Sequence, residues 1–190
     1  MPPWRFKCLM KVIKCSLEQI KKISNGSVLT VGMFDGLHKY HKLIINKTCE
    51  LGNLNKLNKV ILTFDHKPTK VNEVLISESK KIEFIKSNFD IDLIYIIEVN
   101  DFLIKTTKEE FVKIIKDKLN VIFMVEGSDF KFGYKQEGNI QFLQNEFGKD
   151  NIFVFNRDTN ISSSRLKQLI NEEKYEEINK ELEVDIDLLK

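Results

Sequence analysis

Two histidines, His38 and His41, stand three residues apart just after a short glycine-bearing segment. Side chains at this spacing are neighbours on one face of a helix. The backbone N–H groups at the start of a helix carry partial positive charge and bind anions. Two imidazoles beside such donors can hold phosphoryl oxygens and stabilise the charge that develops during phosphoryl transfer. Taken in isolation, the pair is better explained as surface histidines or as two ligands of a metal ion.

The residues around the histidines predict the frame of a phosphate-binding site. Residues 28–31 are mainly apolar and β-branched, which is typical of a buried strand. Gly32 and Gly36 indicate a turn, and the apolar residues 43–45 among polar neighbours indicate a helix. A strand, a turn and a helix start in this order place the two histidines where an anion would bind.

The composition is that of a soluble globular protein and excludes several other classes. The chain has 190 residues, of which 42% are hydrophobic and 31% charged, with a net charge of +2. One domain over residues 1–190 is therefore expected. A charge so close to zero argues against nucleic acid or membrane surfaces as partners, and the sequence does not indicate the oligomeric state.

The cysteines and the N-terminus favour a cytoplasmic protein. Cys8, Cys15 and Cys49 are odd in number and follow no metal-binding spacing, so neither a disulfide framework nor a zinc site is indicated. The first ten residues lack the apolar run of a signal peptide, and no segment approaches the ~20 apolar residues of a membrane span.

Strands and helices are predicted to alternate along the chain. The strands are expected at residues 11–14, 28–31, 60–64, 93–99, 121–125 and 151–155. The helices are expected at residues 16–19, from Tyr40 to Gly52-Asn53, at 77–88, 107–119, around 142–147, at 163–171 and from Lys174 onward. This alternation predicts an α/β fold with a parallel sheet and helices on both faces. Ligands of such sheets bind beyond the carboxyl ends of the strands.

The segment GMFDGLHKYH resembles the signature G-x-F-D-G-x-H-x-G-H of the HxGH nucleotidylyltransferases, in the form found in bacterial FAD synthetases. Besides the two histidines, the matching residues are Gly32, Phe34, Asp35 and Gly36. The segment differs from the signature at Met33, where a small polar residue is usual, and at Tyr40, where glycine is usual. Within this motif, phosphate binding becomes the favoured interpretation of the histidines.

A second resemblance follows the strand expected at residues 60–64. The enzymes have F-[DE]-P-H-P there, and this chain matches at Phe64, Asp65 and Pro68, with His66 and Lys67 between them. Pro68 also suits a stiff exit from a strand.

A third resemblance follows the strand expected at residues 121–125. The segment 127–133, GSDFKFG, fits G-x-[DN]-F-x-F-G, and Gly138-Asn139 fits the end of a further R-x-G-[DN] motif in which Gln136 replaces the arginine. Glycine after a strand lets a nucleotide approach the backbone. The aromatic residues Phe130 and Phe132 are more often packing residues than flavin contacts.

A fourth resemblance precedes the last helical region, where residues 161–165, ISSSR, fit I-S-S-T-R. Serines at a helix start cap the helix and leave donors for phosphate. Arg165 is one of only three arginines among thirty basic residues, which suggests that its guanidinium has a specific task.

The resemblance implies a Rossmann-like adenylyltransferase module that transfers AMP from ATP to FMN and releases FAD and pyrophosphate, with Mg²⁺ as the cofactor of ATP. It implies that Asp129 binds the metal and that the β- and γ-phosphates contact Arg165. The residues that it assigns to catalysis are His38, His41, Asp129 and Arg165. Those that it assigns to ATP are Gly32, Phe34, Asp35, Gly36, Gly127, Ser162 and Ser163, and those assigned to FMN are Phe64, Pro68, Phe130 and Asn139.

Several alternatives stay open at this point. Bacterial FAD synthetases usually carry a C-terminal riboflavin kinase domain, which is absent from these 190 residues. The chain is therefore either a stand-alone adenylyltransferase or a fragment. A catalytically degenerate nucleotide- or flavin-binding protein of the same fold, an interaction protein, or a transferase with another acceptor would also fit. We expect the Tyr40 side chain to point out of the site.

Overall fold

A computed structural model describes residues 10–66, 75–156 and 163–184 of the chain. Six parallel strands in these ranges form one sheet with the order β1-β4-β3-β2-β5-β8. Their bounds are β1 (Lys11–Cys15), β2 (Ser27–Val31), β3 (Asn58–Phe64), β4 (Leu93–Ile97), β5 (Val121–Gly127) and β8 (Ile152–Phe155). The predicted parallel α/β fold is thereby confirmed.

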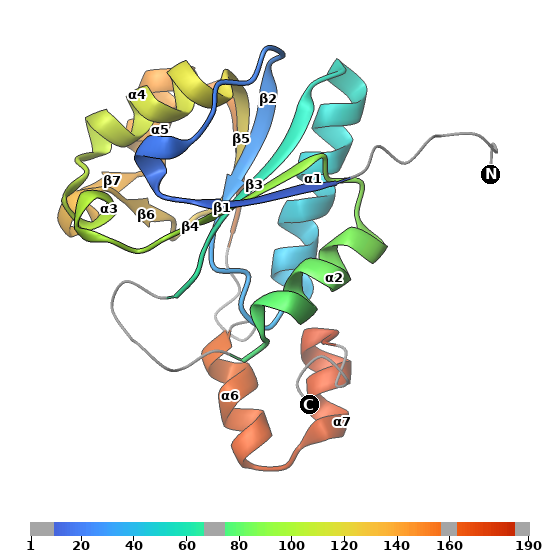
Figure 1. The fold of residues 1–190 in the computed structure, drawn as a ribbon. Helices are drawn as coiled ribbons and strands as arrows, with labels where there is room; N and C mark the ends of the chain where they lie inside the picture. The colour runs from blue at the N-terminus through green and yellow to red at the C-terminus, as the bar shows by residue number, and fades with distance from the viewer. Residues whose placement is uncertain (1–9, 67–74, 157–162, 185–190) are drawn as a thin grey trace.

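Helices cover both faces of the sheet, as Figure 1 shows. On one face lie α1 (Lys39–Asn55) and α2 (Glu78–Asn88), and on the other lie α4 (Lys108–Leu119) and α5 (Ile140–Phe147). The short helix α3 (Asp101–Lys105) precedes α4. The C-terminal elements are α6 (Ser163–Asn171), α7 (Tyr175–Glu177) and a π-helical segment, Ile178–Leu182. They form a hairpin beyond the end of the sheet at which α1 begins (Figure 1).

The central strand β2 has buried side chains throughout, as expected for a parallel strand covered on both faces. Because successive side chains of a strand point to opposite faces, Leu29 and Val31 lie in the core beneath α4 and α5, while Val28 packs beneath α1 and α2. A separate small cluster holds the C-terminal hairpin together, with the buried residues Leu166, Leu169, Ile178 and Val184. No helix in the described ranges has both the length and the apolar character needed to cross a membrane.

Side chains cap the starts of two helices. Ser77 accepts a hydrogen bond from the Lys80 N–H at the start of α2. The spacing of Thr107 and Glu110 predicts a capping box for α4, and the structure confirms it. A helix cap can be predicted from the sequence because it involves residues only three positions apart.

The predicted end of α1 at Gly52-Asn53 is wrong. The helix continues to Asn55, and Lys56 ends it in the left-handed conformation, with φ 57°. Gly52 lies inside the helix because a β-carbon there would collide with the Lys59 side chain on β3. This glycine therefore permits close packing of helix and strand and does not end the helix.

The short 3-10 helix Leu17–Gln19 agrees with the brief helix predicted at residues 16–19. Other short elements had no predicted counterpart. They are α3, an antiparallel ribbon of β6 (Lys131–Phe132) and β7 (Gly138–Asn139), and the 3-10 helices Tyr134–Gln136 and Lys149–Asn151. β4 ends two residues earlier than expected, and β5 continues to Gly127 through pairing with β8. Elements of two to five residues are too short to show a hydrophobic period.

Candidate functional site

The two histidines lie together at the start of α1. His38 is the N-cap residue of the helix, and its ring is stacked on that of His41, with centroids 3.8 Å apart and an angle of 19° between the ring planes. Only 2% of the His38 residue surface is exposed. The Phe34 ring meets His41 edge-on at 5.4 Å. The packing therefore holds both imidazoles in one orientation beside the N–H groups of a helix start.

A tight turn connects β2 to this helix. Phe34, Gly36 and Leu37 have positive φ angles of 50°, 87° and 41°. A β-carbon on Gly36 would lie 2.7 Å from Leu166 Cδ2, so a glycine is required both by the conformation and by the contact with α6. Positive φ at two non-glycine residues is uncommon and marks a turn that its surroundings hold in place.

Two buried polar side chains, one in the turn and one on α2, hold the turn in place through hydrogen bonds. Asp35, predicted to bind ATP, accepts a hydrogen bond from the Leu75 N–H at 2.8 Å. Lys81 of α2 was not identified from the sequence, and it donates to the Met33 carbonyl at 3.1 Å and to Thr63 Oγ1 at 3.0 Å. Burial lowers the pKa of Lys81, against the opposing effect of the Glu78 and Asp35 carboxylates. Asp35 and Lys81 therefore position the loop that carries the histidines.

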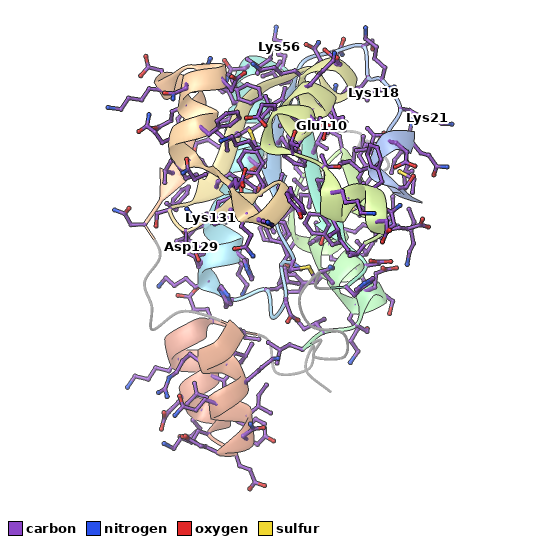
Figure 2. All side chains as sticks on the ribbon, turned by 90° about the vertical axis from the view of Figure 1, so that its left-hand side faces the viewer. Lys21, Lys56, Glu110, Lys118, Asp129 and Lys131 are labelled. Atoms are coloured by element: carbon purple, nitrogen blue, oxygen red, sulfur yellow. The ribbon has the colours of Figure 1, made fainter. Side chains whose placement is uncertain are left out.

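A small cavity of about 130 Å³ with polar and apolar lining includes both histidines in its wall, where the carboxyl ends of β2 and β5 meet the start of α1. It brings together seven of the residues predicted for the site, namely Gly32, Phe34, His38, His41, Gly127, Asp129 and Phe130. Figure 2 labels Asp129 at the end of the domain opposite to Lys56 and Lys118. The convergence agrees with the rule that parallel sheets bind ligands at the carboxyl ends of their strands.

The expectation that Tyr40 points out of the site is wrong. Its residue is only 8% exposed and lines the cavity, and its hydroxyl donates to the Phe155 carbonyl at 2.6 Å. A β-carbon on Gly127 would lie 2.6 Å from the Tyr40 hydroxyl oxygen. The tyrosine thus connects α1 to the end of β8 through a hydrogen bond, and its ring forms part of the cavity wall without filling the cavity.

Glu126 is a cavity residue that the sequence analysis did not identify. Its carboxylate accepts a hydrogen bond from the Val31 N–H at 2.9 Å, and only 2% of the residue is exposed. Burial raises the pKa of this carboxyl group well above its usual range, and the bond from Val31 opposes the shift only in part. An acidic residue directly before the glycine of GSDFKFG was the available signal.

A larger apolar groove of about 500 Å³ lies beside the cavity and shares Val31, Gly32 and Phe130 with it. It includes Phe64 and Phe130, both predicted for FMN, and it is otherwise lined by Met33, Leu103, Ile104, Thr106, Phe111, Lys131, Phe132, Gly133, Lys135 and Gln136. The rings of Phe130 and Phe132 are stacked at 5.5 Å. The groove thus offers an aromatic wall with two lysines in its lining.

Two other predicted residues, Asn139 and Arg165, line neither the cavity nor the groove. The Asn139 side chain caps α5 by accepting from the Phe142 N–H at 2.9 Å, and it is not part of the groove lining. Arg165 donates to Gln168 Oε1 at 3.2 Å and lies 3.7 Å from Glu177 Oε2, and it does not line the cavity. Ser163 begins α6, but its side chain lies outside the described part. Pro68 and Ser162 also lie outside the described residues, so their roles remain predictions.

The donor set at the cavity fits a magnesium ion that arrives with a nucleotide. Asp129 lines the cavity, and its Oδ1 would be 3.0 Å from a β-carbon on Gly127. The described residues contain no group of three or more His, Cys, Asp or Glu side chains that could hold a metal by themselves. Mg²⁺ usually takes only one or two carboxylates and completes its shell with phosphates and water. One carboxylate beside a phosphate site therefore fits.

Comparisons with known proteins agree with the geometry. Bifunctional riboflavin kinase/FMN adenylyltransferases of two Buchnera aphidicola strains, from Schizaphis graminum and Acyrthosiphon pisum, are 30% and 31% identical over 88% and 71% of this chain. The chain covers 57% and 45% of those proteins, or about half of their length.

A solved Streptococcus pneumoniae structure described as a macrolide-efflux protein has a TM-score of 0.71 at 24% identity, over 84% of this chain and 55% of that one. At this identity the likeness shows the shared fold alone. The sequence model of the FAD synthetase family matches residues 20–177. The chain therefore belongs to the FAD synthetase family.

Proposed function

We propose that the protein transfers the AMP part of ATP to FMN and so forms FAD and pyrophosphate. The observation that carries the proposal is the stacked histidine pair in the wall of a cavity that adjoins an apolar groove. The histidines and the helix start suit phosphates, and the groove suits a flat aromatic ring. Relatives named FMN adenylyltransferase support the same reaction.

The chemistry needs positioning and charge stabilisation. A phosphate oxygen of FMN attacks the α-phosphorus of ATP, the bond to the β-phosphate oxygen breaks, and pyrophosphate leaves in line with the attack. The attacking phosphate is already anionic, so no general base is required. His38 and His41 hold the triphosphate and stabilise the charge at the α-phosphate, because they are preorganised in a largely buried site.

Two further residues act on the charges of the triphosphate. Asp129 would hold Mg²⁺ together with the phosphates, and the ion would neutralise charge on the leaving pyrophosphate. Arg165 would bind the β- and γ-phosphates through its planar guanidinium. Its present partners, Gln168 and Glu177, would then have to be exchanged for phosphate oxygens.

The apolar groove would bind the isoalloxazine ring of FMN. Aromatic side chains such as Phe130 stack well on a flat ring. A ring in the groove would place the phosphate end of FMN toward the histidines, because the groove and the cavity share Val31, Gly32 and Phe130.

A second candidate is a non-catalytic protein that binds nucleotide or flavin. Tyr40 favours it, because its ring narrows the cavity at the helix start where phosphates would sit. In this case ATP or FMN binds but no AMP is transferred.

One experiment separates the candidates. Purified protein is incubated with ATP, Mg²⁺ and FMN, and FAD is measured by chromatography, with the double variant His38→Ala/His41→Ala as the control. FAD above the level of the control supports the enzyme. If folded protein forms no FAD, calorimetry with ATP and with FMN decides between a binding protein and one that binds neither.

A further inference from the structure

The strands β2 and β5 separate at their carboxyl ends. They pair from Ser27 to Leu29, opposite Val121–Met124. Beyond this point β2 continues beside β3 as far as Val31, while β5 continues beside β8 as far as Gly127. The Glu126 carboxylate spans the gap and accepts the Val31 N–H, which faces β5. Glu126 therefore completes the hydrogen bonding of β2 and leaves space between the strands.

The gap contains two buried polar groups with unused hydrogen-bonding capacity. Glu126 is 2% exposed, and the Val31 N–H is its one hydrogen-bond donor among the described residues. Thr30 is fully buried, and its Oγ1 has no hydrogen-bond partner among the atoms described. Both residues line the 130 Å³ cavity. Buried polar atoms without partners are costly, so the cavity is suited to a ligand with polar atoms or to water.

The chemistry of this pair selects hydroxyl groups rather than phosphates. The Glu126 carboxyl group can accept a hydrogen bond in either protonation state, and a hydroxyl group can donate one to it, whereas a fully ionised phosphate has no hydrogen to donate. The Thr30 hydroxyl can both donate and accept, which also matches a hydroxyl partner. Phosphates would instead be bound by His38, His41 and the N–H groups at the start of α1.

The position of the cavity indicates which hydroxyl groups these are. It includes both histidines in its wall and shares Val31, Gly32 and Phe130 with the apolar groove. In FMN a chain with three hydroxyl groups connects the aromatic ring to the phosphate. If the ring lies in the groove and the phosphate lies at the histidines, the hydroxylated chain must run past the shared residues Val31, Gly32 and Phe130 and through the cavity that Thr30 and Glu126 line.

We propose that Thr30 and Glu126 form a subsite that recognises the hydroxylated chain of a flavin between the ring groove and the histidines. The proposal rests on the proposed function, because it takes FMN as the acceptor. Glu126 is a specificity-determining residue in this role, since it distinguishes flavins that carry the polyhydroxylated chain from flavins without it.

The test is a binding measurement that requires no catalysis. Dissociation constants for riboflavin, which has the hydroxylated chain, and lumiflavin, which has a methyl group in its place, are obtained from the quenching of flavin fluorescence. The ratio of the two constants is compared among the natural protein, Thr30→Val, Glu126→Leu and Glu126→Gln. Thr48→Val is the matched control, because Thr48 is a fully buried threonine of α1 that is not among the residues lining the cavity and whose hydroxyl already donates to the Ile44 carbonyl.

We expect the natural protein to bind riboflavin about tenfold or more tightly than lumiflavin, since each hydrogen bond to such groups contributes about that factor. Glu126→Leu should abolish the preference and Thr30→Val should reduce it, with lumiflavin affinity unchanged. Glu126→Gln should retain part of it, because the amide can still bond to Val31 and to a hydroxyl group. Thr48→Val should behave as the natural protein. Thr30→Val is nearly isosteric, so it keeps the test valid if Glu126→Leu does not fold.

The proposal is wrong if the natural protein does not distinguish the two flavins, or if the ratio is the same in every folded variant. It is also wrong if the variants weaken ATP binding and leave the flavin ratio unchanged, because the hydroxyl groups would then be those of the ATP ribose. Measuring FAD formation separately distinguishes the two proposals. A preference that depends on Glu126 in a protein that forms no FAD would support the subsite and overturn the enzyme assignment.

Discussion

The start of α1 and the start of α6 both carry residues assigned to phosphates, but the two are held very differently. His38 is 2% exposed and stacked on His41, inside the main body of the protein. Arg165 has a side chain that is 28% exposed and is engaged by Gln168 and Glu177 of its own helical hairpin. The histidines are therefore already held in place for the role that we propose for them, whereas Arg165 would have to change its partners to take its proposed role.

The difference follows from what each helix packs against. α1 covers the sheet with several core residues, including Ile44, Ile45 and Leu51. The hairpin of α6 and α7 has a small apolar cluster of its own. Among the described residues, its contacts with the rest of the protein are Leu75 and Gly36 against this cluster, an ion pair of 2.7 Å between Lys39 and Glu183, and a hydrogen bond from Lys42 to the Glu183 carbonyl. These contacts are fewer than those of α1 with the sheet, and exposed ion pairs contribute little, so we expect the hairpin to be the more readily displaced of the two parts.

The largest effect is expected from the histidines. His38→Ala or His41→Ala should each cost about 2 to 4 kcal/mol of transition-state stabilisation, as for other preorganised donors in buried sites. The measurement is kcat/KM for FAD formation, with Lys47→Ala, a partly exposed position later on α1, as the control. A decrease in kcat/KM of less than threefold in both variants would contradict a catalytic role for the two buried histidines.

The second effect concerns the buried carboxyl group beside the histidines, and it is a dependence of stability on pH. Because the pKa of Glu126 is raised in the folded protein, the unfolded chain loses this proton first as the pH rises above about 4.5. The natural protein should therefore lose stability relative to Glu126→Gln as the pH rises from about 4.5 toward the raised pKa, by at most about 1.4 kcal/mol per pH unit. Below pH 4.5 the difference should no longer change with pH.

Urea unfolding of both proteins between pH 4 and 8 measures this difference. Lys47→Ala again serves as the control, since an exposed ion pair should not produce the same trend. A difference that grows toward acidic pH would mean that Glu126 is ionised and stabilised in the folded state.

A smaller effect is expected at the tyrosine that ties α1 to β8. Tyr40→Phe removes the donor to the Phe155 carbonyl and keeps the ring, so it should lower the free energy of unfolding by about 1 kcal/mol. The activity should change little, because the histidines remain in place. Thermal unfolding and the FAD assay check both statements. Tyr40→Gly is less informative, since it also removes a buried ring and places glycine in a helix.

The smallest effect, a change in the affinity for ATP, is expected from Glu177 in the C-terminal hairpin. Glu177→Gln removes the ion pair with Arg165, whose side chains are 28% and 42% exposed, and such pairs contribute about 0 to 1 kcal/mol. If Arg165 exchanges this partner for a phosphate, the Kd for ATP should fall by about twofold or less. The same substitution in an Arg165→Ala background should have no effect. Weaker ATP binding in Glu177→Gln would mean that Glu177 positions the arginine.

Much of the fold was predictable from local patterns. The capping box of Thr107 was identifiable because its partner, Glu110, lies three positions away. The parallel strands were identified because buried strands are apolar throughout. The end of α1 was missed because the need for Gly52 comes from the packing of Lys59 on another strand, which a turn signal in the sequence does not reveal.

For the site, the sequence by itself determined the strand, the turn and the histidine-bearing helix, since strand pattern, turn glycines and helix spacing are all local properties. The tertiary structure alone decided how other polar residues are used. Asn139 caps a helix, Tyr40 bonds to β8, and Glu126 accepts the N–H of Val31, 95 positions away. A side chain of this kind acquires its role from whichever backbone group the packing brings within about 3 Å, and that distance is not encoded in any stretch of neighbouring residues.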